Sequence, residues 1–156
     1  MSYMAVVLRP ASREDAELLF TWANDPDVRR VSFSTAPIPW EEHVDWLEAR
    51  LRDPDALVFV ALSEGAPVGT VRFELRGDRA TISVALAPHA RGRGLGQQTV
   101  AAGVEEVLRA TSVSVVNAVV KDGNAASKQA FLAAGFSVDG RMSVGGEPAI
   151  RLTRHR

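Results

Sequence analysis

A turn that joins a strand to a helix through three glycines at alternate positions is the feature that most constrains this chain. It reads HARGRGLGQQ over residues 89–98, and the preceding ATISVALAP has the composition of a strand. A helix start presents unpaired backbone N–H groups and the positive end of the helix dipole, and glycines let a ligand approach that backbone. The pattern therefore predicts a phosphate or pyrophosphate site, or else only a tight turn with surface arginines.

Two common phosphate-binding motifs do not fit this turn. The dinucleotide motif G-x-G-x-x-G fails because position 97 is Gln, which makes the spacing G-x-G-x-G. That motif also follows the first strand of a βαβ unit, whereas this turn follows three strands that read as an antiparallel meander. A nucleoside-triphosphate loop is excluded because its G-K-S/T triplet is absent.

The meander spans residues 56–88, with turns predicted at Glu64-Gly65 and Gly77-Asp78. A two-residue turn at Gly77-Asp78 fixes a register that pairs Arg76 with Arg79, Glu74 with Thr81 and Arg72 with Ser83. The residues between them are apolar, so one face of the meander is predicted to be core. The polar face is either solvent-exposed surface or the lining of a cleft.

The rest of the chain alternates helical and strand patterns. We expect strands over 4–10, 112–120, 136–144 and 148–154, helices over 12–23, 39–51, 95–110 and 124–134, and a turn-prone link over 28–38. This order predicts a single α/β domain over residues 1–156, with a mixed, mostly antiparallel sheet.

Composition limits the partners and the location. The chain has 156 residues and a net charge of −1, so neither nucleic acid nor a membrane surface is expected as a partner. It has no cysteine, which excludes disulfides and thiolate metal sites and favours a cytoplasmic location. We assign no metal ligand, and no apolar run approaches the ~20 residues of a membrane span.

Two motifs at the right separation resemble the GNAT family of N-acetyltransferases. Arg91-Gly-Arg-Gly94-Leu-Gly96 resembles the family's Q/R-x-x-G-x-G/A motif, and the segment from Asn124 to Gly135-Phe136 resembles its later N-x-x-A/S…GF segment. The order of elements agrees over about residues 5–154. The resemblance implies the GNAT fold, acetyl-CoA as cofactor and a small-molecule amine as acceptor, in a monomer or homodimer.

The same resemblance implies which residues bind acetyl-CoA. The backbone of the strand end would pair with the pantetheine arm, the glycine-rich turn would hold the pyrophosphate, and the later helix start would contact the pantetheine or the acetyl end. The residues so implied are Val84, Ala85, Leu86, Arg91, Gly92, Arg93, Gly94, Leu95, Gly96, Gln97, Asn124 and Ser127. Asn124 is equally well suited to cap its own helix.

Two groups that many family members use are absent. Phe131 stands where the family's acidic Tyr is common, Val119 stands where a Glu is common, and the only tyrosine is Tyr3. The usual acid is therefore unassigned, although a thiol pKa near ~8.5 makes a thiolate a tolerable leaving group. For the base we favour Glu74, directly or through water, with Ser83 and Arg72 ordering that water or the substrate. The alternative for Glu74 is an exposed strand residue paired with Arg72 or Arg76.

Without a strong base, an acceptor of low pKa is favoured. Deprotonating a lysine amine of pKa ~10.4 at pH 7 costs about 4.6 kcal/mol, whereas an α-amine at ~8 costs about 1.4 kcal/mol. A sugar amine or a peptide α-amine is therefore preferred to lysine.

Residues 19–74 also resemble acetyltransferases that act on nucleotide-linked 4-amino sugars in pseudaminic-acid-type biosynthesis. The pattern is W-x-N-D-P-x-V-R…SF…I-x-W-x-x-H, whose W-x-N-D-P beginning is shared by ribosomal-protein acetyltransferases; Ala23 departs from it, because many relatives have Arg there. The substrate-binding residues implied are Arg29, Phe33, Trp40, His43 and Arg72. The alternative is that the aromatic residues and His43 are packed and the arginines are solvated.

The sequence thus predicts acetyl transfer from acetyl-CoA to a primary amine, with a nucleotide-linked amino sugar or a related small molecule as acceptor. Two alternatives stay open at this point. One is an N-terminal or ribosomal-protein acetyltransferase, and the other is a non-catalytic acyl-CoA-binding sensor module.

Overall fold

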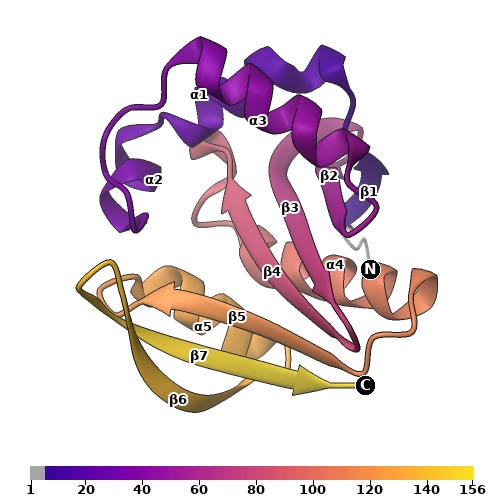
Figure 1. Cartoon of the computed structure of the whole chain (residues 1–156), viewed down its shortest axis with the longest axis vertical. Helices are drawn as coiled ribbons and strands as arrows, with labels where there is room; N and C mark the ends of the chain where they lie inside the picture. The colour runs from indigo at the N-terminus through magenta and orange to yellow at the C-terminus, as the bar shows by residue number, and fades with distance from the viewer. Residues whose placement is uncertain (1–5) are drawn as a thin grey trace.

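A seven-stranded sheet forms the centre of the molecule in the computed structural model, which describes residues 6–156 (Figure 1). Its order is β1-β2-β3-β4-β5-β7-β6, and only β4 and β5 pair in parallel. The strands are β1 Val6–Pro10, β2 Ala56–Ser63, β3 Ala66–Arg76, β4 Arg79–Leu86, β5 Val115–Lys121, β6 Ser137–Val144 and β7 Glu147–His155. The predicted mixed, mostly antiparallel sheet is confirmed; Tyr3 and the start of the predicted first strand lie outside the described residues.

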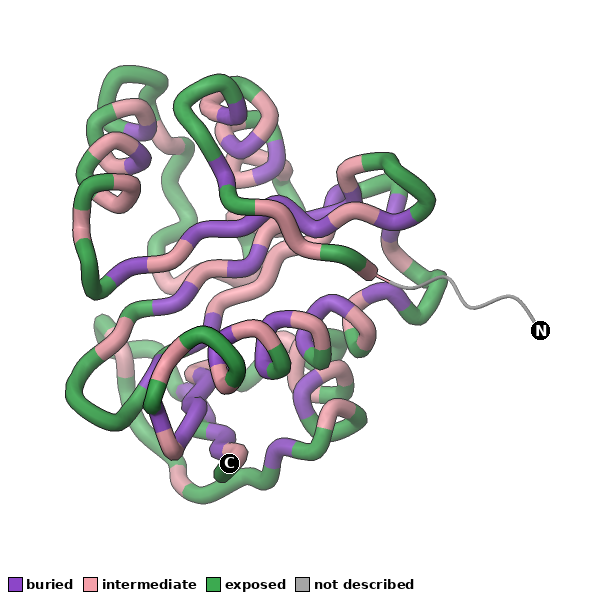
Figure 2. Tube along the Cα trace, turned by 90° about the vertical axis from the view of Figure 1, so that its right-hand side faces the viewer, coloured by how far each residue is buried: buried purple, intermediate pink, exposed green. Residues whose placement is uncertain are grey.

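Helices cover the two faces of the sheet in different places (Figure 1). They are α1 Ala16–Ala23, α2 Pro26–Val31, α3 Trp40–Arg52, α4 Leu95–Ala110 and α5 Ala125–Ala133, with 3-10 turns at Arg13–Asp15 and Pro88–Ala90. One core, which includes Val71, Phe73 and Val104, lies between the sheet and α4 and α5. A second core, which includes Trp22, Leu47 and Val60, lies where α1 and α3 cover the sheet on the β2 side. Figure 2 shows the buried positions concentrated along the central strands and the inner sides of the helices.

The predicted meander and its register are confirmed. β3 and β4 join at Gly77, whose φ is 61°, and Arg72 pairs with Ser83 and Glu74 with Thr81. The alternate residues Val71 and Phe73 are at most 1% exposed. The polar side chains of β3 and β4 therefore point to the face opposite α4.

The link over 28–38 is more ordered than the sequence suggested, because its first residues belong to helix α2. Pro26 occupies the first helical position, and the Asp25 carboxylate accepts hydrogen bonds from the N–H groups of Asp27 and Val28. An Asp cap followed by Pro is a strong helix start. The Asn24-Asp25-Pro26 sequence that follows the predicted helix over 12–23 thus begins the next helix.

The parallel pairing of β4 and β5 is short. It joins Arg79 to Val115, Ala80 to Val116 and Thr81 to Asn117, and then stops. Beyond this point the two strands diverge, as Figure 1 shows. Residues 82–86 of β4 remain paired with β3 on one side, while their backbone groups on the β5 side have no partner strand in the described chain.

Gly69 fixes the position of the free end of β4, and its replacement by Ala is expected to destabilise the fold. Gly69 lies opposite Leu86, and a Cβ at this position would lie 2.5 Å from the carbonyl oxygen of Ala85. Because that atom is backbone, β4 itself has to shift. We expect Gly69→Ala to lower the free energy of unfolding by about 1–3 kcal/mol, measured by urea titration. Gly123→Ala is the control, since a Cβ there meets nothing within 4 Å; equal stability of the two variants would contradict this account.

Candidate active site

The free edge of β4 is the first component of the site. Val84, Ala85 and Leu86 pair with β3 through one edge and leave the other edge open toward β5. An extended ligand with amide groups can add to such an edge as an extra strand. The open edge is compatible with the contact to the pantetheine arm that the family resemblance implies for these residues.

The glycine-rich turn provides the second component, at the start of α4. Gly92 and Gly94 have φ values of 73° and 74°, in the left-handed region that favours glycine. Within residues 6–156, the N–H groups of Gly92, Arg93 and Gly94 donate to no backbone carbonyl. Unpaired N–H groups beside a helix N-terminus suit a pyrophosphate, so the predicted turn fits the diphosphate of coenzyme A.

The two arginines of this turn behave differently. The Arg91 guanidinium pairs with Asp25 at 2.8 Å and Asp27 at 3.2 Å, and this contact lowers the pKa of Asp25. Its charge is therefore used to fasten the turn to the start of α2. Arg93 is exposed and forms no ion pair with any described residue, so its guanidinium is available to a ligand.

Helix α5 contacts the start of α4 and carries the other predicted cofactor residues at its own start. Asn124 caps α5 by accepting a hydrogen bond from the N–H of Ser127 at 3.2 Å, and the Gln97 side chain donates to the carbonyl of Ala133 at 3.3 Å. Phe131 is 3% exposed and packs edge-on against Phe136. Position 131 is thus part of the core and offers no proton to a leaving group.

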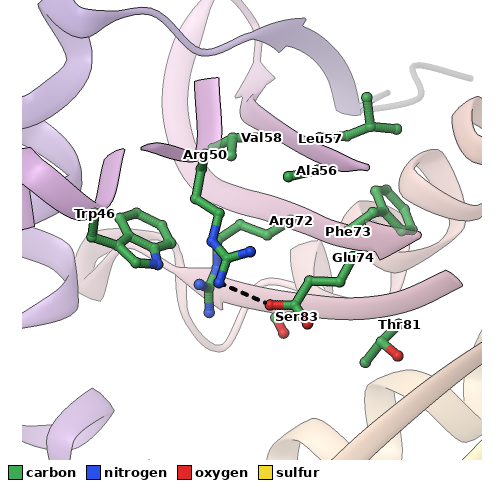
Figure 3. Close-up of a pocket in the computed structure, with 10 residues that line it drawn as sticks. All are labelled: Trp46, Arg50, Ala56, Leu57, Val58, Arg72, Phe73, Glu74, Thr81 and Ser83. Carbon is green, nitrogen blue, oxygen red and sulfur yellow. Dashed lines mark ion pairs between the residues drawn. The ribbon is translucent and has the colours of Figure 1, made fainter. Parts of the chain in front are cut away.

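The polar face of β3 and β4 lines a cleft under α3 (Figure 3). Its cavity has a volume of about 110 Å³, and it brings together the predicted residues Arg72, Glu74 and Ser83. The lining also includes Trp46, Arg50, Ala56, Leu57, Val58, Phe73 and Thr81. The sequence analysis missed Trp46 and Arg50, although their spacing of four places both on the same side of a helix.

Three charged side chains dominate this cleft. Arg72 lies over the Trp46 ring, 5.0 Å from its centroid, and Arg50 forms an ion pair with Glu74 at 3.2 Å. Burial lowers the pKa of Arg72, and the nearby Arg50 lowers it further. The Glu74 side chain is 66% exposed. Glu74 is thus paired with an arginine of α3 and not with Arg72 or Arg76 of its own strand, and its carboxylate stays accessible in the cleft.

The structure corrects the expected position of Arg29, which stabilises a loop and does not line the cleft. Its guanidinium donates to the carbonyl oxygens of Ala23, Ser34 and Ala36 and to the Ser32 hydroxyl. Burial lowers the pKa of Arg29. These bonds hold the segment after α1 in its conformation, a role that a sequence pattern does not distinguish from ligand binding.

The three predicted ring-bearing substrate residues also lie outside the cleft lining. Phe33 is partly buried. Trp40 is 45% exposed and packs edge-on against Phe20 in a separate hollow beside Arg13. His43 is 3% exposed, and its Nε2 lies 3.0 Å from the carbonyl oxygen of Ala16, to which it donates. Trp40 and His43 therefore belong to the packing between α1 and α3.

The W-x-N-D-P residues have structural roles too. Trp22 is 5% exposed in the second core. The Asn24 side chain donates to the Ile38 carbonyl at 3.0 Å and accepts from the Ile38 N–H at 2.7 Å, which closes the loop. Asp25 caps α2 and binds Arg91. The motif thus fixes the conformation of the segment after α1 and fastens it to the glycine-rich turn.

Comparison with known proteins identifies the family. The family model described as acetyltransferase (GNAT) domain matches residues 5–137. The chain therefore belongs to the GNAT acetyltransferases, and the predicted acetyl-CoA-dependent N-acetyltransferase activity is confirmed at this level.

Solved structures agree with the fold. The ribosomal-protein-alanine N-acetyltransferase from Brucella melitensis has 28% identity, a TM-score of 0.81, and coverage of 96% of this chain and 99% of that chain. Aminoglycoside acetyltransferase AAC(6')-Ib with coenzyme A and kanamycin has 20% identity, a TM-score of 0.87, and coverage of 97% and 95%. Spermidine N-acetyltransferase from Vibrio cholerae with CoA and spermine has 15% identity, a TM-score of 0.87, and coverage of 98% and 96%.

Within residues 6–156, no helix combines the length and apolar character that a bilayer crossing requires.

His43 is expected to make stability depend on pH near neutrality. Burial lowers its pKa below the ordinary value of 6.5, so the folded state favours the neutral ring. This contribution is complete above the unfolded pKa and is lost as pH falls through the folded pKa. The stability difference between the natural protein and His43→Phe should therefore shrink from pH 7.5 to pH 5, measured by chemical denaturation at each pH. A constant difference would contradict a buried neutral imidazole.

Proposed function

We propose that this chain acetylates a small primary amine that reaches the end of β4 through the cleft under α3. The observation that carries the proposal is the position of the polar cleft beside the free edge of β4. Ser83 belongs to both, because its side chain lines the cleft and its backbone lies just past the end of the β4–β5 pairing. A thioester held along that edge would have its acyl end close to an amine in the cleft.

On the donor side, acetyl-CoA supplies an activated acetyl group. The backbone of Val84, Ala85 and Leu86 would bind the pantetheine arm, and the unpaired N–H groups from Gly92 to Gln97 would bind the pyrophosphate. Arg93 would add charge to this anion site, and the Asn124 side-chain amide, whose oxygen caps α5, keeps its NH₂ group for the ligand. Arg91 contributes its backbone and, through Asp25, the position of the turn.

On the acceptor side, Glu74 is our candidate base. Its carboxylate and the Ser83 hydroxyl both belong to the lining of the cleft (Figure 3). An ammonium acceptor has to lose a proton before its nitrogen can attack a carbonyl carbon, and Glu74 would accept that proton directly or through a water ordered by Ser83. The ion pair with Arg50 holds the carboxylate in place at 3.2 Å.

The acceptor that we favour is the amine of a nucleotide-linked amino sugar. Its support is the sequence resemblance of residues 19–74, together with the absence of a hydroxyl at Phe131 and of a carboxylate at Val119. A second candidate is a peptide α-amine, favoured by the 28% identity to the ribosomal-protein-alanine N-acetyltransferase. Mass spectrometry after incubation with acetyl-CoA and a nucleotide-linked 4-amino sugar or an alanine-initiated peptide distinguishes them. Acetylation of the peptide alone would reject the sugar assignment.

Gly96→Asp is expected to weaken acetyl-CoA binding at least tenfold, or about 1.4 kcal/mol. A Cβ at Gly96 makes only ordinary contacts, at 3.5 Å from Ala130 and 3.6 Å from Leu86, so the fold should tolerate a side chain there. A carboxylate would place negative charge beside the pyrophosphate. Gly96→Ala is the matched control, because it adds the Cβ without the charge. Calorimetric titration measures the affinity of both variants for acetyl-CoA. Equal affinities would contradict binding of the pyrophosphate at this turn.

Glu74→Gln is expected to lower turnover by about 10²-fold or more below the pKa of the acceptor amine, and by less above it. The reason is that the amine needs proton removal only while it is an ammonium. Steady-state rates from pH 6 to pH 9.5 measure the profile. Glu147→Gln, at an exposed position of β7, is the control for loss of one negative charge. A pH-independent reduction would exclude Glu74 as the base.

A further inference from the structure

The cleft under α3 contains more positive charge than its own residues neutralise. Among residues 6–156, no carboxylate lies within 4.0 Å of the Arg72 guanidinium, and that group donates no hydrogen bond to a described residue. The groups that act on it electrostatically are Arg50, Glu74 and Arg29. Within the cleft, two arginines therefore share one carboxylate, and Glu74 is already paired with Arg50.

Arg72 is also held in place before any ligand arrives. The Trp46 ring supports its guanidinium from α3 at 5.0 Å, while its strand position is fixed by pairing with Val58 of β2 and Ser83 of β4. Figure 3 shows the ends of Arg72 and Arg50 converging from β3 and α3 into the same cavity. A preorganised planar guanidinium loses little entropy when it binds an oxyanion, and it offers two parallel N–H donors.

The unsatisfied donors and the unbalanced charge point to an acid group on the acceptor. A carboxylate or a phosphate has the oxygen spacing that a guanidinium recognises, and a cavity of about 110 Å³ has room for one such group. The Ser83 hydroxyl provides a further donor at the same position. A polyammonium acceptor has the wrong charge for this surface, since like charges in a partly desolvated cleft repel each other.

We propose that Arg72, supported by Trp46 and assisted by Arg50, is a subsite for a carboxylate or phosphate attached to the amine acceptor. This inference rests on the proposed N-acetyltransferase function and sets the acceptor class: an amine that also carries an acid group. This acceptor class differs from kanamycin and spermine, the two ligands of the solved acetyltransferases described above, because both ligands carry several amines. Arg72 would thus determine the specificity for the acceptor, while Glu74 and Ser83 would serve the removal of the proton from its ammonium group.

The test uses amines that differ only in the acid group. Glucosamine 6-phosphate is compared with glucosamine, and a free amino acid with its amide, while spermidine represents the polyamines. Affinity is measured by calorimetry on the protein saturated with coenzyme A, and kcat/KM is measured with acetyl-CoA. We expect at least a tenfold preference for one acid-bearing member over its neutral partner, and no detectable binding of spermidine. The pair that shows it identifies phosphate or carboxylate as the group bound.

Variants of two arginines on the same strand assign the preference to a residue. Arg72→Gln should lower the affinity for the acid-bearing amine at least tenfold and leave the affinity for its neutral partner unchanged. Arg72→Lys keeps the positive charge but lacks the two parallel N–H donors, so its affinity should lie between those of Arg72→Gln and the natural protein. Arg76→Gln removes the same charge from an exposed position of β3 and should retain the preference. Thermal denaturation and acetyl-CoA affinity confirm that each variant is folded.

Three results would contradict the proposed subsite. They are equal affinity for both members of each pair, tighter binding of spermidine than of the acid-bearing amines, and an equal loss of affinity for both members of a pair in Arg72→Gln. The proposed function fails differently, through absence of acetyl transfer to every amine. Because the calorimetric comparison needs no turnover, it reports on the subsite in either case.

Discussion

The early end of the β4–β5 pairing is the constraint on which the rest of the site depends. Only Arg79, Ala80 and Thr81 pair with β5, and the strands then separate. Continued pairing would leave no free edge at residues 82–86 of β4. The backbone groups exposed by the separation have to bond to something, because unpaired groups in a narrow space are costly. In the proposed function, a ligand with its own amides would satisfy them, so the early end of the pairing would also favour binding.

The two sides of that opening are chemically different and mechanically connected. In the proposed function, the α4 side would present N–H groups and Arg93 to a diphosphate, while the α3 side would present Arg72, Arg50 and Glu74 to the acceptor. Arg91 joins them, because it belongs to the glycine-rich turn and binds the two carboxylates at the start of α2. Lys121, at the end of β5, also reaches the carbonyl oxygens of Arg30 and Ser32 at 3.4 Å. The segment after α1 is therefore held from both halves of the sheet.

Local patterns predicted most of the fold, because the signals concerned were short-range. The Gly77-Asp78 turn alone fixed the register that placed Arg72 opposite Ser83, and the pairing agrees at every position from Arg76 to Gly69. Substrate residues were harder to predict. Arg29 and His43 have side chains capable of binding a ligand, but their partners are backbone carbonyls. Such partners depend on tertiary approach, which spacing does not encode. Trp46 and Arg50 were missed for a related reason: only the packing of α3 over β2 and β3 turns their side toward the cleft.

The pairing of Arg91 with Asp25 has a consequence for how relatives of this fold can diverge and be re-engineered. Asp25 begins α2 and at the same time pairs with an arginine of the glycine-rich turn, so the segment after α1 is not structurally independent of that turn. Replacing residues 24–38 by the segment of a relative with a different acceptor would leave the Arg91 guanidinium without this partner unless the new segment has a carboxylate at the same position. Changes of acceptor are thus coupled to the inheritance of a single ion pair some sixty residues apart in the chain.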